Sequence, residues 1–431
     1  MINKINKSIK ILIISNYDLY GGASIAGYNL HQSLIRNGFK SLMIVQNKIS
    51  NDPTVIQKEN KINKWISNLI MDRWSFPFNY RAGIMMRKFS SYFNEWYKSS
   101  LIEKHNLKQN NFYSISKFKP DIIHFHTGGG DNFYDLREIK TLSKFYKTVF
   151  SIHDLWILTR QPPMVLYDNI KEAIIYKYHQ INQSKINFIA HSNWVYNNFS
   201  ETKTLEGSPI HLIKYSININ RFRSIDKNQI RNKLKIPKNV FIIMTTAVGI
   251  LSNPFKDFET LYKAYINILN NNKNFLLIVA GDKKSNFNTK TYSDKFLFIN
   301  PFPQSQELIE YYSCADLYIQ SSNIETWGLA ISEALSCSLP VIASSVGAIP
   351  EQVMGFNRGK TRDQLNQYPI NKANGLLFEK NNSRSLQESI LWMYNNKNKM
   401  KILGKNARSF AKKKLNIDQQ IHKYIEYYSA L

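Results

Sequence analysis

The chain has 431 residues, of which 43% are hydrophobic and 20% charged. This composition is typical of a folded globular protein and excludes disordered and low-complexity classes. Lysine and arginine total 57 against 31 aspartate and glutamate residues, which gives a formal net charge of +26. That charge favours an anionic partner such as nucleic acid, a phosphorylated ligand or an acidic membrane surface. The abundance of Lys, Asn and Ile offers a second explanation, a drift in genome composition.

Two further properties bound the class of protein. The cysteines, Cys314 and Cys337, are too few for a disulfide framework or a cysteine-based zinc site. The amino-terminal apolar run Ile9–Ser15 is interrupted by Lys10 and is too short for a signal peptide. The longest apolar stretch, Val240–Leu251, has about 12 residues, whereas a membrane span needs about 20. We therefore expect a cytoplasmic protein that is soluble or peripheral on the inner membrane face.

Short apolar runs bounded by turn residues alternate with helical patterns along the chain. Those in the first half are Ile11–Ser15, Ser41–Gln46, Ile122–His126, Val149–His153 and Phe188–His191. Those in the second half are Phe241–Thr246, Phe275–Ala280, Leu317–Ile319 and Val341–Ser344. Near-continuous apolar strands separated by helices indicate parallel sheets covered on both faces. Two such sets in series predict two Rossmann-like, doubly wound α/β domains.

The domain boundary is expected in the polar region that follows the fifth run. We predict a first domain over residues 1–215, a second over 216–410 and a C-terminal helix over 411–431 that packs back on the first domain. The segment 61–100 carries ten aromatic residues and seven Lys/Arg. This composition is typical of a helical insert that contacts a membrane surface or an acceptor. A pair of ordinary helices packed on the first domain is the alternative.

Gly21 and Gly22 follow the first strand and open a helix expected over 25–37. Small residues let the backbone approach a ligand, and free N–H groups at the helix start would face it. The full G-x-G-x-x-G spacing is missing, and Gln46 and Asn47 stand where a dinucleotide site needs an acidic residue. The pattern therefore disfavours an NAD enzyme. A tight turn without a ligand is the alternative interpretation.

The most informative pattern is Glu325 and Glu333, eight residues apart and flanked by apolar residues. Gly328 and Ala330 stand at the start of the helix between them. At 1.5 Å per residue, the spacing corresponds to roughly 12 Å. This spacing suits a nucleotide sugar. One carboxylate can bind hydroxyls of the sugar, the helix N-terminus can bind the diphosphate, and the second carboxylate can bind the ribose diol. A solvated helix face is the alternative.

The order of these motifs resembles the family 4 glycosyltransferases, which have the GT-B fold. Glu325-Thr-Trp-Gly-Leu through Glu333-Ala resembles the E-x7-E motif of that family. The resemblance continues through Leu339–Ala343, Val346–Glu351 and Asn374–Phe378, and covers most of residues 240–380. In the first half, Gly21-Gly22-Ala23 resembles the glycine loop beneath the donor, and Ser151–Trp156 resembles the His-Asp motif.

The resemblance implies a fold and a set of roles. The fold would be GT-B, two Rossmann-like doubly wound parallel-sheet domains facing across a cleft. Catalytic roles would fall to His153, Glu325 and Lys256. The donor-binding residues would be Gly21, Gly22, Glu333, Trp327, Gly328, Leu329 and Ala330.

Several positions depart from the family pattern. The family usually has an Arg and a Lys-Gly after the first strand of the second domain. Lys256 matches the Lys, but Asp257 replaces the Gly, and Ile250 and Phe255 stand where an Arg is common. The leaving group would then be held more weakly, or by another cation such as Lys283. Thr159–Pro163 also replaces a family loop, which suggests altered acceptor recognition, and Ser338 replaces a usual glycine.

The resemblance implies retention of anomeric configuration. Retaining hydrolases use two carboxylates about 5 Å apart, and Glu325 and Glu333 are too widely spaced for that. We therefore expect front-face transfer, in which the leaving phosphate helps to deprotonate the acceptor and His153 contacts the donor sugar. Negative charge on that phosphate would be met by cations and helix N-termini. No Asp-x-Asp metal motif is present, so neither a catalytic metal nor a cofactor is expected.

The expected function is transfer of a hexose-type sugar from a nucleotide-diphosphate sugar to a saccharide acceptor in bacterial surface polysaccharide biosynthesis. The acceptor is expected to be lipid-linked. The expected partners are that donor, the acceptor and an anionic membrane surface. A nucleic-acid partner is not expected, because no nucleic-acid motif accompanies the charge. A GT-B sugar-nucleotide epimerase and a non-catalytic GT-B subunit that binds a sugar or a partner enzyme are the alternatives.

Overall fold

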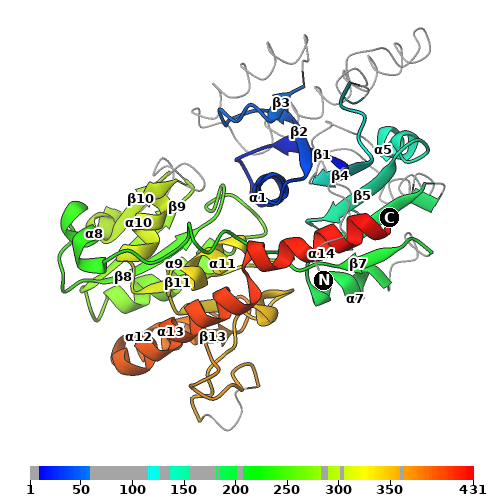
Figure 1. The fold of residues 1–431 in the computed structure, drawn as a ribbon. Coiled ribbons are helices and arrows are strands. Elements are labelled where there is room, and N and C mark those ends of the chain that lie inside the picture. The colour runs from blue at the N-terminus through cyan, green and yellow to red at the C-terminus, as the bar shows by residue number, and fades with distance from the viewer. Residues whose placement is uncertain are drawn as a thin grey trace. The chain divides into compact units, whose positions relative to one another are not determined.

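The computed structural model describes residues 9–58, 115, 117–126, 136–154, 157, 181–182, 184–200, 207–282, 290–300, 305–359 and 364–431. The aromatic segment 61–100, the loop 159–163 and Lys283 lie outside the described residues. The chain divides into two compact units (Figure 1). The first comprises Met1–Ala190, Tyr196–His211 and Ile425–Leu431, and the second comprises His191–Val195 and Leu212–Tyr424.

In the described part of the first unit, seven strands form one sheet in the order β3-β2-β1-β4-β5-β6-β7. The strands are β1 (Lys10–Tyr17), β2 (Lys40–Asn47), β3 (Val55–Gln57), β4 (Ile122–His126), β5 (Lys147–Ile152), β6 (Ile186–Ala190) and β7 (Ile210–Leu212). The helices are α1 (Gly22–Arg36), α5 (Leu136–Leu142) and α7 (Asn193–Ser200). Every strand pair from β3 to β6 runs parallel, which explains why these strands read as continuous apolar runs.

In the described part of the second unit, six parallel strands form a sheet in the order β10-β9-β8-β11-β12-β13. They are β8 (Phe241–Thr246), β9 (Phe275–Ala280), β10 (Phe296–Ile299), β11 (Leu317–Gln320), β12 (Val341–Ser344) and β13 (Gly375–Phe378). The α-helices are α8 (Lys227–Lys233), α9 (Phe258–Leu269), α10 (Gln306–Cys314), α11 (Leu329–Ser336), α12 (Ser383–Asn395), α13 (Lys397–Lys414) and α14 (Ile417–Ala430). The part of α14 from Ile425 onward is assigned to the first unit. Two 3-10 helices, η4 (Lys290–Lys295) and η5 (Ile349–Glu351), complete the described elements.

The core of the second unit lies between one face of this sheet and the helices α9 and α12. Alternate strand residues such as Ile243, Leu277 and Ile319 are fully buried there against Leu261 and Ile390. Helix α11 packs on β11 and β12 and against α13. Helices therefore cover the sheet through apolar stripes, and its carboxyl edge is left to the loops.

The prediction of two doubly wound parallel-sheet domains is confirmed. All nine predicted strand runs coincide with strands of the structure. The strands that were not predicted are β3, β7, β10 and β13, which have three or four residues each and lie at or beside the ends of the sheets. Within the described residues, no helix is both long and apolar enough to span a bilayer.

A buried arginine ties α8 to the sheet of the second unit. The Arg231 guanidinium pairs with Asp316 at 2.6 Å and donates to the carbonyl oxygens of Cys314, Lys238 and Val240. Arg231 is 4% exposed, so its guanidinium has little access to water and depends on these partners. Asp316 also accepts from the backbone N–H of Ile242 in β8.

Replacing this arginine should destabilise the second unit. Arg231→Met removes the buried partner of the Asp316 carboxylate and the donor to three carbonyl groups, although Asp316 keeps Lys227 and the Ile242 N–H. We expect a loss of about 3 kcal/mol in unfolding free energy. Urea unfolding followed by circular dichroism measures it. Lys263→Met is the control, because Lys263 forms an exposed pair with Glu259 and its loss should leave the midpoint unchanged. Equal midpoints for the two variants would contradict the assignment.

Candidate active site

The predicted glycine loop of the first unit lies at a point where the order of strands reverses. The chain passes from β1 to β2 on one side, and β4 pairs with the other side of β1. Ligands of doubly wound sheets bind beside such a reversal, at the carboxyl ends of the strands. Gly21 has φ of 79° and is the N-cap of α1, which begins at Gly22. A left-handed φ favours glycine, so this turn depends on the residue type.

His153 directly follows β5, at the same edge of the first sheet. Its Nε2 lies 3.0 Å from Nδ1 of His126, the last residue of β4. The neighbouring His124 lies 2.6 Å from the Tyr428 hydroxyl and 2.8 Å from Ser151 Oγ. Neither His126 nor His124 is among the predicted catalytic residues, which are His153, Glu325 and Lys256. The structure brings His126 into contact with His153, which no pattern in the sequence indicated.

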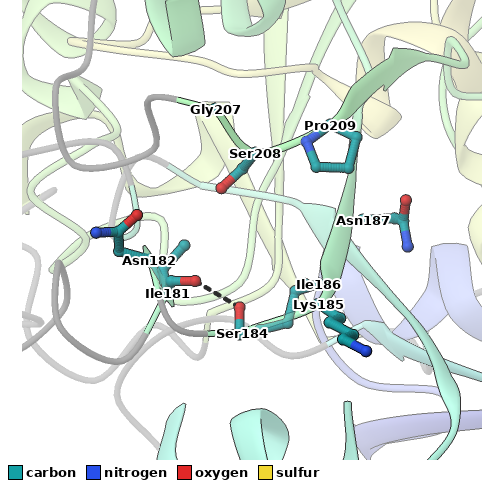
Figure 2. Close-up of a pocket in the computed structure, with 9 residues that line it drawn as sticks. All are labelled: Ile181, Asn182, Ser184, Lys185, Ile186, Asn187, Gly207, Ser208 and Pro209. Carbon is teal, nitrogen blue, oxygen red and sulfur yellow. Dashed lines mark hydrogen bonds between the residues drawn. The ribbon is translucent and has the colours of Figure 1, made fainter. Parts of the chain in front are cut away.

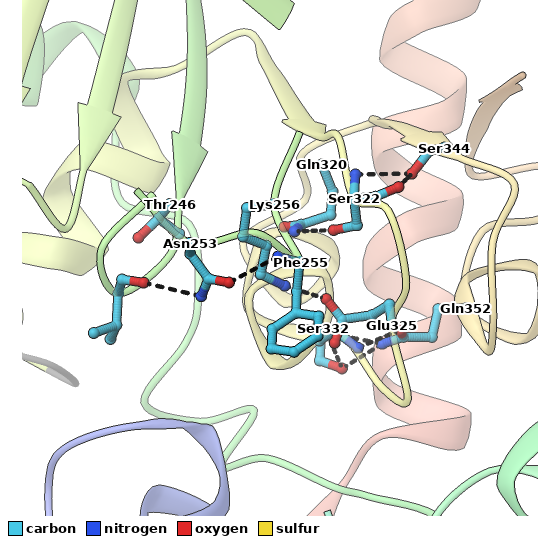
Figure 3. Close-up of polar contacts among 12 residues, drawn as sticks. Thr246, Asn253, Phe255, Lys256, Gln320, Ser322, Glu325, Ser332, Ser344 and Gln352 are labelled. Atoms are coloured by element: carbon cyan, nitrogen blue, oxygen red, sulfur yellow. Dashed lines mark hydrogen bonds and ion pairs between the residues drawn. The ribbon is translucent and has the colours of Figure 1, made fainter. Parts of the chain in front are cut away.

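The second sheet has its own reversal, between β8 and β11. The loop after β8 carries Lys256 and the loop after β11 carries Glu325. The Lys256 ammonium and the Glu325 carboxylate form an ion pair, with side chains 17% and 12% exposed (Figure 3). The two loops are joined by the backbone N–H of Asn323, which donates to the carbonyl of Phe255 at 2.9 Å. The structure therefore fixes a cation and a carboxylate together at this edge.

The departures around Lys256 have local explanations. Ile250, at one of the positions where an Arg is common, is 5% exposed and belongs to the core. Asp257, in the place of a glycine, is the N-cap of α9 and accepts the backbone N–H of Thr260 at 3.1 Å. Phe255 is 49% exposed. Ile250 thus serves packing and Asp257 serves helix capping, and Lys256 is the basic residue of the loop 247–257.

The backbone of Glu325 is held by the loop after β12. The N–H of Ala348 donates to the Glu325 carbonyl oxygen at 2.9 Å. Gly347 has φ of 56°, and a Cβ on it would lie 2.0 Å from that oxygen. Only a glycine permits this approach, so the Gly347 of the sequence motif positions Glu325.

The predicted residues Trp327, Gly328, Leu329 and Ala330 form the start of α11. Gly328 is the N-cap and has no side chain to cap the helix. The Trp327 indole donates to Ser332 Oγ at 3.2 Å, and the side-chain amide of Gln352 contacts Gly328 and Ser332. Leu329 and Ala330 are half-buried. A helix start with no acidic residue in its first turn favours an anionic ligand.

Glu333 lies on α11 with 8% of its surface exposed. The Tyr312 hydroxyl donates to its carboxylate at 2.9 Å. Burial raises the pKa of Glu333 to about 7, although the Tyr312 hydrogen bond and the charge of Arg221 act in the opposite direction. The carboxylate is therefore close to half-protonated at neutral pH, and a ligand that donates hydrogen bonds would favour its ionised form. The sequence carried no signal for the role of Tyr312.

The candidate site residues thus divide between the two units. Gly21, Gly22 and His153 lie at the carboxyl edge of the first sheet. The remaining residues lie at the carboxyl edge of the second sheet or on α11, namely Lys256, Glu325, Glu333 and 327–330. The described residues contain no group of three or more His, Cys, Asp or Glu side chains that could hold a metal ion.

A pocket of about 270 Å³ lies elsewhere in the first unit (Figure 2). Its lining residues include Ser184, Asn187 and Pro209, and the Ser184 hydroxyl donates to the Ile181 carbonyl at 2.6 Å. Ile186, the first residue of β6, is part of the lining, so the pocket lies at the amino end of that strand. None of the candidate site residues lines it.

Comparison with known families identifies a similarity in the second unit. Residues 226–410 match the family model "Glycosyl transferases group 1". This part of the chain is therefore similar to the glycosyltransferases of that group. The match includes Lys256, Glu325, Glu333 and the start of α11, which are the groups that the second unit brings together at its carboxyl edge.

Curated proteins that are similar to this chain match parts of it. An uncharacterized glycosyltransferase of Methanocaldococcus jannaschii is 26% identical over 270 residues, which cover 62% of this chain and 66% of the relative. The alpha-monoglucosyldiacylglycerol synthase of Acholeplasma laidlawii is 27% identical over 188 residues, covering 41% of each chain. The matched segments span less than two thirds of the length of these relatives.

Solved structures show the fold of the whole chain. The sucrose-phosphate synthase of Thermosynechococcus elongatus covers 98% of each chain with a TM-score of 0.69 at 16% identity. HepE of Anabaena, in complex with UDP-glucose, covers 98% of this chain and 100% of its own, with a TM-score of 0.63 at 15% identity. The architecture of two Rossmann-like domains is that of the GT-B glycosyltransferases.

The raised pKa of Glu333 predicts a dependence of stability on pH. Between about pH 4.5 and pH 7 the folded chain retains a proton that the unfolded chain has lost, so the unfolding free energy falls as the pH rises. Glu333→Gln does not titrate. The unfolding free energy of Glu333→Gln minus that of wild type should therefore increase with pH across this range, by up to about 3 kcal/mol. Above pH 7 the difference should become constant.

Urea unfolding of both proteins at a series of pH values measures this difference. Glu259→Gln is the control, because Glu259 is exposed on α9. The unfolding free energy of this variant relative to wild type should not increase over the same pH range. A pH-independent difference between Glu333→Gln and wild type would show that the buried carboxylate titrates normally.

Proposed function

We propose that the chain is a glycosyltransferase that moves a hexose-type sugar from a nucleotide-diphosphate sugar to an acceptor, with retention of anomeric configuration. One observation carries this proposal. A cation, a carboxylate and a helix start without a capping side chain lie together where the second sheet reverses its strand order. That combination suits a phosphorylated sugar, because each part of the ligand meets a group of matching chemistry.

The donor is proposed to bind along this edge. The diphosphate takes the N–H groups at the start of α11, where Leu329 and Ala330 begin the helix, together with the Lys256 ammonium. Glu333 accepts the ribose hydroxyls, and Glu325 accepts hydroxyls of the sugar. Gly21 and Gly22 of the first unit are also proposed to bind the donor. The similarity in fold to HepE, whose structure contains UDP-glucose, supports a nucleotide-sugar donor.

The proposed reaction breaks the bond between the anomeric carbon and the donor phosphate. Both electrons of that bond leave with the phosphate oxygen, whose negative charge Lys256 and the α11 N-terminus stabilise. The acceptor hydroxyl attacks from the same face and gives its proton to the leaving phosphate, which retains the configuration. His153 contacts the donor sugar. No metal or cofactor takes part in this scheme.

The acceptor is proposed to be a saccharide carried on a lipid, at the inner face of a bacterial membrane, during assembly of a surface polysaccharide. The formal net charge of +26 supports attraction to an anionic surface. The similarity to a relative that is named alpha-monoglucosyldiacylglycerol synthase supports an acceptor with a lipid part. Under this proposal the enzyme is cytoplasmic and peripheral.

Nucleotide binding tests the donor site. UDP, GDP and ADP, each free and as sugar conjugates, are titrated by calorimetry into wild type, Lys256→Met and Glu325→Gln. We expect wild type to bind one nucleotide series. Lys256→Met should lose at least about tenfold in affinity for the free diphosphate, because a charge-assisted contact is lost. Glu325→Gln should lower the affinity for the sugar conjugate more than the affinity for the free nucleoside diphosphate, because Glu325 is proposed to contact the sugar.

Lys263→Met is the matched control for Lys256→Met, since it removes a lysine of the same unit that lies on the exposed surface of α9. Its affinities should equal those of wild type. Transfer to an acceptor, with the product anomer assigned by NMR, then tests retention. A wild type that binds none of these nucleotides contradicts the proposed function, and an inverted product contradicts the front-face mechanism.

A further inference from the structure

The loop that follows β12 is connected to the proposed donor site at both of its ends. Near its start, Ser344 Oγ accepts the backbone N–H of Ser322 at 2.9 Å and donates to the Ser322 carbonyl at 2.9 Å. In the middle, Ala348 holds the Glu325 carbonyl oxygen. At its end, Gln352 reaches Gly328. The segment from Ser322 to the start of α11 is therefore held by one neighbouring stretch of chain, residues 344–352.

Gln352 makes the contact that fixes the start of the helix. Its Oε1 accepts the Gly328 N–H at 3.0 Å, and its Nε2 donates to the Gly328 carbonyl at 3.0 Å and to Ser332 Oγ at 2.9 Å (Figure 3). Gln352 is fully buried. The amide therefore spans both backbone groups of one residue, and this geometry determines the direction of the Gly328 peptide.

The geometry matters because Gly328 cannot fix its own conformation. It has no side chain to cap α11, and glycine has more conformational freedom than any other residue. The next N–H groups along the chain, those of Leu329 and Ala330, take their direction from the Gly328 peptide. An anion at this helix start needs these N–H groups to converge on it.

We propose that Gln352 is a positioning residue that orients the N-terminus of α11 toward the diphosphate of the donor. The inference rests on the proposed function, since it concerns the same site. Gln352 itself touches no ligand in this proposal. Its effect should therefore fall on the diphosphate and leave the nucleoside, which Glu333 binds from further along α11, nearly unchanged.

A second buried amide in the same unit provides a matched comparison. Asn366 Oδ1 accepts the Leu377 N–H at 2.7 Å, and its Nδ2 donates to the Leu377 carbonyl at 2.8 Å. Asn366 is 1% exposed, so its burial and its two-point contact with one residue resemble those of Gln352. It holds β13, however, whereas Gln352 holds the start of α11. A purely structural amide should behave like Asn366.

The experiment compares Gln352→Met with Asn366→Leu in the full chain. Dissociation constants for uridine and UDP are measured by calorimetry well below the melting temperature, with guanosine and GDP or adenosine and ADP if wild type prefers those bases. For Gln352→Met we expect UDP to bind at least about tenfold more weakly, with uridine changed by less than about threefold. Asn366→Leu should lower the melting temperature and leave the ratio of the two constants unchanged.

Gln352→Asn provides a second variant in case Gln352→Met does not fold. It keeps an amide in the core but withdraws it from Gly328 by one carbon–carbon bond, about 1.5 Å. The same selective loss of UDP binding is expected. If the affinities of the Gln352 variants for uridine and UDP fall equally, or if neither affinity falls, Gln352 is a packing residue and the inference is wrong. A wild type that binds no nucleoside diphosphate overturns the proposed function and this inference with it.

Discussion

The reversal of strand order between β8 and β11 is the constraint on which the candidate site of the second unit depends. In a parallel sheet all carboxyl ends share one edge, and ligands of doubly wound sheets bind outside this edge, beside a reversal. Here the loops that follow β8 and β11 carry Lys256 and Glu325. Their opposite charges meet because the topology brings together residues that are 69 positions apart in the chain.

The electrostatics of the site follow from how deeply each charge is buried. Lys256 and Glu325 retain partial exposure and compensate each other, so neither is an isolated charge in the protein. Glu333 is more deeply buried, and its hydrogen-bonding partner Tyr312 is a neutral hydroxyl. The energetic cost of that burial appears as a raised pKa. A ligand with hydroxyl donors would offset part of this cost, which links ligand binding to proton release.

Much of the architecture could be predicted because the signals are local. Apolar runs such as Phe241–Thr246 are buried on both faces, so burial alone determines their sequence pattern. The strands that were not predicted lie at the ends of the sheets. Val55–Gln57, for example, has only three residues and pairs with one neighbouring strand, so it carries little apolar pattern of its own. The role of Asp257 did not follow from the sequence. Comparison with the family pattern shows only that a glycine is absent at this position, whereas in the structure the Asp257 side chain caps α9.

The sequence by itself determined the two parallel sheets, the positions of Glu325 and Glu333 on either side of a helix start, and the identity of Lys256 as the basic residue of its loop. These properties depend on residue type and on spacing along the chain. The tertiary structure alone decided that Lys256 meets Glu325, that Tyr312 donates to Glu333, that His126 contacts His153 and that Gln352 holds Gly328. Each of these contacts joins residues separated by 20 or more positions. Such contacts depend on how strands and helices pack, and no local pattern along the chain encodes the distance between them.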